Sequence, residues 1–246
     1  MEELRRTVES LSDEMVPIRQ GWVFRSRSLD NVFALNQVRF RGPVDLARAV
    51  AVADEEMSGL RFRHVVVEDD SRNELAGHFA EAGWDMERTV LMRLVGDPQV
   101  SSGQTDLVEL SEEQMVDIME TWALEEHVGI LPERLAQLSE YNRRAGRLWH
   151  EKCLGVLDET GSPVAITKLR MKEKTAWVED VYTVPSSRRR GYARMLVSRA
   201  AAMAQSQGCS FTFMIADDDD WPKELYADIG FEPVGIARSF RLRLSS

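Results

Sequence analysis

Residues 181–193 read Val-Tyr-Thr-Val-Pro-Ser-Ser-Arg-Arg-Arg-Gly-Tyr-Ala, and this stretch decides the fold. It predicts a strand that ends before Pro185, a loop, and a helix that begins near Gly191. The first turn of a helix has four backbone N–H groups without partners in the helix, and the helix dipole is positive at that end. Small residues such as Gly191 and Ala193 let a bulky anion approach the backbone closely. The junction therefore predicts a binding site for a phosphate or diphosphate.

Two common nucleotide-binding motifs do not occur in the sequence. It contains neither a Gly-x-x-x-x-Gly-Lys-Ser/Thr loop nor the Gly-x-Gly-x-x-Gly turn of dinucleotide-binding folds. The three arginines at 188–190 add positive charge at the rim of the predicted anion site. The alternative interpretation is a basic helix N-terminus that faces solvent and binds no ligand.

The chain around this junction alternates between strand and helix patterns. Ser111 and Gln114 have the spacing of a capping box, which predicts the start of a helix. Turns at 159–162 and 172–175 separate strands that should pair as antiparallel hairpins. The predicted elements of the second half are strand 107–110, helices 111–126 and 132–144, strands 152–157, 163–171 and 176–184, helix 190–205, strand 211–216, helix 221–228 and strand 232–242.

The first half repeats part of this pattern in a shorter form. Residues 78–84, His-Phe-Ala-Glu-Ala-Gly-Trp, match residues 225–231, Leu-Tyr-Ala-Asp-Ile-Gly-Phe, at a separation of 147 positions. Together with the order of elements, the match predicts a duplicated unit. A Gly/Pro/Ser-rich stretch predicts a linker at 98–105 between units at 1–97 and 106–246. The predicted elements of the first half are an extended segment at 22–41, helix 45–57, strand 64–67, helix 74–82 and strand 89–94.

Two motifs resemble those of a known family. Arg188-x-x-Gly191-x-Ala193 after a Val-x-Pro strand end resembles the acetyl-CoA signature of the GNAT N-acetyltransferases, and Leu-Tyr-x-x-x-Gly-Phe at 225–231 resembles their second motif. The resemblance covers about residues 106–244. It implies an α/β fold with a mixed sheet, in which the strand at 176–184 splays from the strand at 211–216. The chain would then hold two GNAT-like units, of which the second is complete.

The resemblance also implies how acetyl-CoA, the expected co-substrate, binds. Its pantetheine arm would pair with the backbone near Tyr182, Thr183 and Val184, and its diphosphate would contact backbone amides after the first arginine of the motif. Relatives often place an asparagine where this chain has Asp219. We expect the acidic run at 217–220 to serve mainly as a helix cap, with Asp220 as the N-cap residue. The residues expected to bind the cofactor beyond that strand are Arg188, Arg189, Arg190, Gly191, Tyr192, Ala193, Arg194 and Asp219.

Three residues are candidates for catalysis. In this family an amine attacks the thioester directly, so a carboxylate or a water near the acceptor must take a proton from the incoming ammonium group. Glu179 and Asp180 lie on the central strand, and only one of them should face the site unless a bulge intervenes. We favour Glu179 as the base; the alternative is that both acids are solvent-facing or ion-paired. Tyr226 is implied to protonate the leaving thiolate, with a core tyrosine as the alternative.

The first half lacks the residues that carry this chemistry. Phe79 stands at the position of Tyr226, and the equivalent of the diphosphate loop contains Pro43, which has no N–H, and Asp45, which repels phosphate. The first unit is therefore predicted to be non-catalytic and structural.

Composition limits the classes of partner. Of 246 residues, 41 are acidic and 31 basic, and residues 1–97 (18 acidic, 13 basic) and 98–246 (23 and 18) each carry −5 of the net −10. A nucleic-acid-binding domain, which needs a clustered basic face, is not expected. Cys153 and Cys209 have no metal-ligand spacing, so no metal is expected.

Neither a secretory signal nor an apolar run of roughly 20 residues is visible, which predicts a cytoplasmic protein without a membrane partner. The expected acceptor is a small-molecule or peptide amine, and the expected oligomeric state is a monomer or homodimer. The rival functions are a non-catalytic acyl-CoA-binding regulator and an interaction protein on a relic fold. His127, Trp149 and His150 are further candidates for the acceptor pocket, with a surface histidine at 127 and a core tryptophan at 149 as the simpler interpretations.

Overall fold

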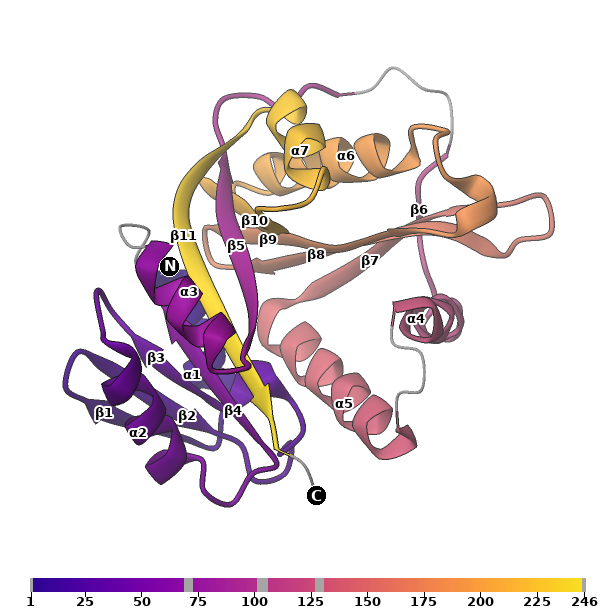
Figure 1. Ribbon diagram of the computed structural model, residues 1–246. Helices are drawn as coiled ribbons and strands as arrows, with labels where there is room; N and C mark the ends of the chain where they lie inside the picture. The colour runs from indigo at the N-terminus through magenta and orange to yellow at the C-terminus, as the bar shows by residue number, and fades with distance from the viewer. Residues whose placement is uncertain (1, 69–72, 101–105, 127–130, 245–246) are drawn as a thin grey trace.

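The computed structural model describes residues 2–68, 73–100, 106–126 and 131–244. Its strands form one mixed sheet of eleven, in the order β1-β2-β3-β4-β11-β5-β10-β9-β8-β7-β6. Figure 1 shows helices on both faces of this twisted sheet. The helices are α1 (Glu2–Leu11), α2 (Leu46–Glu56), α3 (Asn73–Glu81), α4 (Glu112–Glu126), α5 (Pro132–Trp149), α6 (Tyr192–Ser206) and α7 (Pro222–Ile229). The strands are β1 (Glu14–Ile18), β2 (Gly21–Arg25), β3 (Gln37–Phe40), β4 (Phe62–Val67), β5 (Asp85–Leu94), β6 (Val108–Glu109), β7 (Glu151–Leu157), β8 (Pro163–Lys172), β9 (Thr175–Thr183), β10 (Phe211–Asp217) and β11 (Phe231–Arg243).

The elements predicted from the sequence all have counterparts, and their ends shift by a few residues. The capping box at α4 is confirmed, since Ser111 N–H donates to Gln114 Oε1 at 3.1 Å and Gln114 N–H donates to Ser111 Oγ at 3.2 Å. The predicted helix at 132–144 is longer and ends at Trp149. The sequence interpretation missed α1 and β1.

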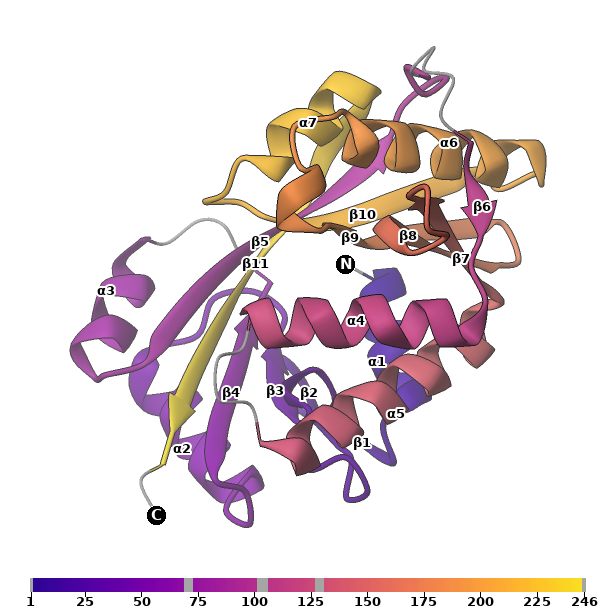
Figure 2. The ribbon, with the colours of Figure 1, turned by 90° about the vertical axis from the view of Figure 1, so that its right-hand side faces the viewer.

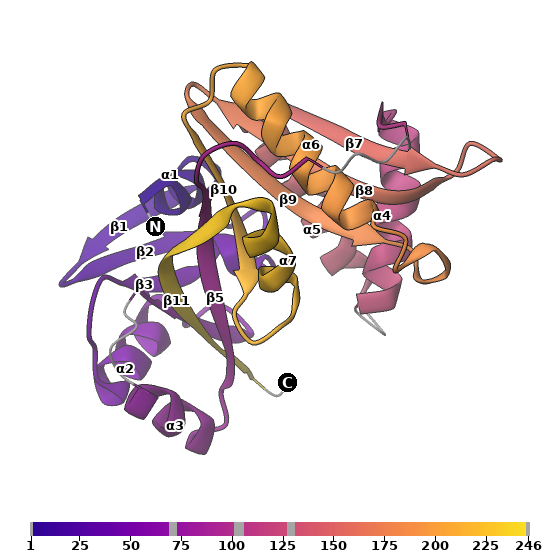
Figure 3. The same cartoon turned by 90° about the horizontal axis from the view of Figure 1, so that it is seen from above.

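The two halves of the chain exchange strands at the centre of the sheet. β5 from the first half lies between β11 and β10, while β11 from the second half lies between β4 and β5. The antiparallel β11–β5 pair runs from Phe231 opposite Leu94 to Arg241 opposite Asp85. Figure 3 shows these two long strands crossing between the halves. Each half therefore depends on the other for a central strand.

Different helices cover the two faces of the second half of the sheet. α6 and α7 lie on one face, over an apolar cluster that includes Val178, Met195 and Met214. α4 lies on the opposite face, where Ile118 packs with Ile166 of β8. α5 lies on the same side as α4, as Figure 2 shows. A ligand bound at the middle of the sheet would thus have α6 and α7 on one side and α4 and α5 on the other.

Two parallel strand pairs behave differently in the two halves. β9 and β10 pair only from Thr175 opposite Phe211 to Trp177 opposite Phe213, although both strands continue beyond these residues. The expected splay is confirmed. In the first half, β3 and β4 stay paired to their ends, and Glu68 N–H still donates to the Phe40 carbonyl at 3.0 Å. The corresponding gap in the first half is closed by backbone hydrogen bonds.

His64 joins the first half to the exchanged strand β11. The side chain, in a residue only 6% exposed, lies with Nδ1 2.8 Å from the Phe33 carbonyl and Nε2 2.8 Å from the Ser239 hydroxyl. Burial disfavours the charged imidazolium and lowers the pKa of His64 to about 4. In the unfolded chain the pKa returns to its ordinary value near 6.5. Between these values the unfolded state binds more protons, so acid destabilises the fold.

We expect the free energy of unfolding to fall by about 2 kcal/mol from pH 7.5 to pH 5 through His64 alone. Urea unfolding at both pH values should show this loss in the wild type and not in His64→Gln, which stays neutral. The difference between the two proteins isolates His64 from the carboxylates that titrate in the same range. Equal pH dependence in both proteins would contradict the assignment.

Candidate active site

The N-terminus of α6 is an open cradle for an anion. Gly191 is its N-cap residue, has a φ of +80° and makes no side-chain capping bond. The first helical bond runs from Met195 N–H to the Gly191 carbonyl at 3.1 Å, so the amides of residues 191–194 lack helical partners. A Cβ atom added to Gly191 would meet nothing within 4 Å. The space and the unpaired amides fit a diphosphate group.

In the first half, the N-terminus of the equivalent helix, α2, is already capped by a side chain. Asp45 is the N-cap residue of α2, and its carboxylate accepts a hydrogen bond from Arg48 N–H at 2.8 Å. A carboxylate at this position uses a free amide and repels phosphate. The two copies of the motif therefore differ in whether the helix N-terminus is uncapped, which is the feature that an anion requires.

Gly191→Ala should weaken CoA binding through both strain and obstruction. A non-glycine residue at positive φ costs roughly 1–2 kcal/mol, and the methyl group would point into the open space. We expect the Kd for CoA, measured by calorimetry, to rise by about tenfold or more. Gly161→Ala is the matched control, because Gly161 has a φ of +85° and equally open surroundings in the β7–β8 turn. The same loss of affinity in both variants would argue against the cradle.

A bulge in β9 brings both candidate bases to one face of the sheet. The register between β8 and β9 shifts between Ile166 and Lys168, and Asp180 has a φ of +52°. Asp180 forms an ion pair with Lys168 at 2.6 Å, and Glu179 forms one with Arg170. Lys168 and Arg170 are two positions apart in β8 and share a face. Because of this bulge, both acids, and not one of them as in a regular strand, project to the side of α4 and α5.

These acids belong to a buried ionic cluster of five side chains. Arg170 Nε also donates to Glu151 Oε2 at 2.6 Å, so two cations meet three carboxylates and the cluster carries one surplus negative charge. The side chains of Lys168 and Arg170 are 2% and 0% exposed, whereas those of the three acids are 15–23% exposed. The surface that a ligand meets is therefore formed by carboxylates.

The two acids of the bulge differ in their affinity for a proton. Burial and the neighbouring charge of Asp180 raise the pKa of Glu179. Burial acts against ionisation of Asp180 as well, but the charges of Lys168 and Arg170 outweigh it and lower the pKa of Asp180. Glu179 is thus the member of the cluster that can take up a proton near neutral pH.

Tyr226 lies on the other face, in the apolar cluster under α6 and α7. The residue is 7% exposed, and its hydroxyl makes no hydrogen bond with any residue that the structure describes. Burial, with a contribution from the charge of Asp220, raises the pKa of Tyr226 to about 12. The phenol stays protonated over the working range of pH and can donate a proton.

The acidic run before α7 is arranged differently from the expectation. The N-cap residue of α7 is Trp221 and not Asp220, whose carboxylate instead accepts the Trp221 N–H at 2.8 Å. A proline at 222 opens the helix, so one orphan N–H is removed without a cap. Asp218 forms ion pairs with Arg88 of β5 and with Lys223. Asp219 N–H donates to Asp217 Oδ1 at 2.8 Å.

Several predicted cofactor residues have partners within the protein. Arg188 and Tyr182 both contact Glu125 of α4, and Arg194 pairs with Asp228 at 2.6 Å. Because these side chains are engaged in other contacts, the groups that remain for a diphosphate in the cradle are backbone amides.

The sequence interpretation missed Glu125, Glu151, Lys168 and Arg170. For Lys168 and Arg170 the sequence does contain a signal, because the two cations alternate with apolar residues in the strand Ala-Ile-Thr-Lys-Leu-Arg-Met.

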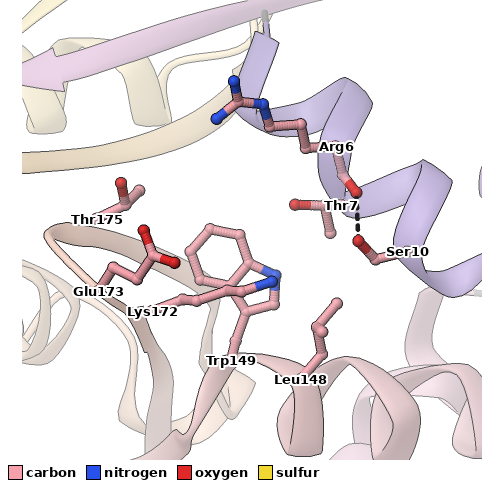
Figure 4. A pocket seen from close by; sticks show the side chains of 8 residues that line it. All are labelled: Arg6, Thr7, Ser10, Leu148, Trp149, Lys172, Glu173 and Thr175. Atoms are coloured by element: carbon pink, nitrogen blue, oxygen red, sulfur yellow. Dashed lines mark hydrogen bonds between the residues drawn. The ribbon is translucent and has the colours of Figure 1, made fainter.

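A separate polar cavity of about 140 Å³ lies between α1, the end of α5 and the β8–β9 turn. Figure 4 shows the side chains of Trp149, Lys172 and Leu148 opposite those of Arg6, Thr7 and Ser10 on α1. Trp149 itself is buried, in an aromatic cluster with Trp177 and Phe213. Apart from Trp149, the cavity is lined by none of the predicted site residues, and it lies at the opposite end of β9 from the anion cradle. His127 falls outside the described residues.

Splayed central strands beside an open helix N-terminus define the class of fold that the two motifs imply. Residues 115–231 match the family model of the acetyltransferase (GNAT) family. This part of the chain is a GNAT-family acetyltransferase domain. No curated protein matches the sequence.

Solved structures share the fold over nearly the whole chain. A functionally unknown conserved protein from Staphylococcus epidermidis has a TM-score of 0.74 at 12% identity, with 95% of each chain covered. A GCN5-related N-acetyltransferase from Kribbella flavida has a TM-score of 0.64 at 17% identity, covering 98% of this chain and 94% of that one. A GCN5-related N-acetyltransferase from Sphaerobacter thermophilus has a TM-score of 0.61 at 15% identity, covering 100% and 86%. At such identities the likeness concerns the fold alone.

Among the described residues, no helix is long and apolar enough to span a membrane. Within the same residues no group of histidine, cysteine and acidic side chains is arranged to hold a metal ion.

Proposed function

We propose that the protein is an N-acetyltransferase that moves the acetyl group of acetyl-CoA to a primary amine of a small molecule, amino acid or peptide. The observation that carries this proposal is the contrast between the two halves. The second half has splayed strands and an uncapped helix N-terminus, whereas the first half has paired strands and a helix capped by Asp45. Among the described residues, the second half alone combines an unpaired strand edge with an uncapped helix N-terminus.

Different segments of the chain bind different parts of acetyl-CoA. The amides of residues 191–194 hold the diphosphate, and the unpaired edge of β9 beyond Trp177 pairs with the pantetheine arm. Acetyl-CoA supplies the thioester whose acetyl group passes to the amine. The splay directs that group toward the face where the β9 bulge presents Glu179 and Asp180.

The ionic cluster and Tyr226 supply the proton transfers. The incoming ammonium group gives one proton to Glu179, so that the surplus negative charge of the cluster is neutralised. The nitrogen forms a bond to the acetyl carbon while the carbon–sulfur bond breaks, and the nitrogen then releases its second proton to solvent to give the neutral amide. Tyr226 gives its phenolic proton to the leaving sulfur. The resulting phenolate, unfavourable at a pKa of about 12, recovers a proton from solvent.

The first half has a structural role in this proposal. It contributes β5, which pairs with β10 from Thr89 opposite Asp217 to Arg93 opposite Phe213 and so supports the second strand of the splay. The units at 1–97 and 106–246, the intervening linker, the monomeric or homodimeric state and the cytoplasmic location stay predictions.

The alternative function is a regulator that binds acyl-CoA without turnover. It is favoured by the ion pairs of both candidate bases, since a paired carboxylate is a weaker proton acceptor.

CoA release from acetyl-CoA with a panel of amines distinguishes the two functions, provided that calorimetry measures acetyl-CoA binding in parallel. Binding together with amine-dependent CoA release supports the acetyltransferase. Binding without release for any amine would favour the regulator, and no binding at all would overturn both.

A further inference from the structure

The carboxylate of Glu125, in the last turn of α4, joins three segments of the chain. Its Oε2 accepts a hydrogen bond from the Tyr182 hydroxyl, at the end of β9, at 2.7 Å. Its Oε1 forms an ion pair with the guanidinium of Arg188, in the loop before α6. Nε of Arg188 in turn donates to the Thr183 carbonyl at 3.0 Å. Both oxygens of Glu125 are thus used to connect α4 with β9 and with the loop.

Ring contacts reinforce these bonds. Trp122, one turn before Glu125, stacks on Tyr182 with ring centroids 5.4 Å apart and an interplanar angle of 13°. The Arg188 guanidinium lies 6.0 Å from the centroid of the same tyrosine ring. Tyr182 is buried in the apolar cluster that also holds Ile118 of α4. Charge-assisted bonds and stacking therefore hold the end of α4 in one place.

The position of α4 matters because of the face that it covers. Tyr182 projects to the same side of the sheet as Glu179 and Asp180, opposite to α6. An amine that approaches these acids must pass the helices on this side. In addition, Glu125 neutralises Arg188, so that this arginine serves the contact with α4 and the diphosphate is left to the backbone amides.

We propose that Glu125 is a positioning residue that, through Tyr182 and Arg188, fixes α4 beside the acceptor site and thereby determines amine binding, while CoA binding is left unchanged. The kinetic part of this inference rests on the proposed acetyltransferase function. The placement of α4 rests on the contacts alone.

Glu125→Gln tests the inference because it keeps the size and one acceptor oxygen but removes the charge. We expect the KM for the amine to rise by at least about fivefold, with kcat and the KM for acetyl-CoA unchanged within about twofold. Glu120→Gln is the matched control, since Glu120 is an exposed acid of the same helix, and it should leave all three constants unchanged. Arg188→Gln in the Glu125→Gln background should raise the amine KM no further, because the two residues act as one unit.

Hydrogen exchange provides a readout that does not need turnover. The backbone amides of residues 116–126 should exchange about tenfold faster in Glu125→Gln than in the wild type or in Glu120→Gln. A rise in the KM for acetyl-CoA equal to that for the amine, or unchanged exchange in α4, would overturn the inference. Faster exchange in a protein that acetylates no amine would overturn the proposed function and still support the placement of α4 by Glu125.

Discussion

Tyr226→Phe should reduce the rate of acetyl transfer by about 100-fold, while acetyl-CoA binds as tightly as before. The variant removes only the hydroxyl, which has no hydrogen-bond partner in the described part of the chain, and keeps a ring that packs in the apolar cluster. Without the hydroxyl no protein group donates a proton to the leaving thiolate from this side. Turnover is measured by CoA release, and binding by calorimetry.

Stability serves as the control for this variant. Because the hydroxyl makes no hydrogen bond with the described residues, its removal costs little, and the melting temperature of Tyr226→Phe should equal or slightly exceed that of the wild type. Full activity in a folded variant would remove Tyr226 from the mechanism. A parallel loss of acetyl-CoA binding would show that the residue binds the cofactor.

Arg170→Met should reduce the free energy of unfolding by about 3–5 kcal/mol. Arg170 is completely buried and contacts both Glu151 and Glu179. Its removal leaves Lys168 as the one cation of the cluster against three carboxylates, and the uncompensated buried charge costs more than the desolvated pair itself contributes. Urea unfolding at pH 7.5 measures the loss.

A second ion pair of the same type provides the comparison. Arg144 pairs with Glu140 at 2.9 Å on the surface of α5, so Arg144→Met should cost less than about 1 kcal/mol. Glu179→Gln introduced into Arg170→Met should restore part of the lost stability, because it removes one unpaired charge. Equal losses for both arginine variants would show that the cluster is not a buried ionic network.

Much of the second half of the fold could be predicted from local patterns. Alternation in β7–β9, the capping box at Ser111 and Gln114, and the glycine before α6 each act over a few residues, and each has the expected structure. The predictions that failed also have local causes. Trp221 caps α7 in place of Asp220 because Pro222 already removes one orphan N–H.

The environment of the candidate bases was much less predictable. The sequence allowed for a bulge near Glu179 and Asp180 but not for the cations that meet them. Lys168 and Arg170 lie on the neighbouring strand of the hairpin, 12 and 9 positions before Asp180 and Glu179, and only the register of β8 against β9 together with the bulge makes these side chains meet. Glu125 was missed for the same reason, since 63 positions separate it from Arg188.

The sequence by itself determined where the anion cradle lies and why the first half lacks one, because helix N-termini, glycine conformations and caps depend on neighbouring residues. Only the tertiary structure decided that β5 and β11 exchange between the halves and that β3 and β4 stay paired, whereas the family resemblance already implied the splay of β9 from β10. Strand order and pairing depend on contacts between residues far apart in sequence, and similar local patterns are compatible with several such arrangements. The same physics placed a buried ionic cluster under the bulge, where burial and neighbouring charge set the proton affinity of Glu179.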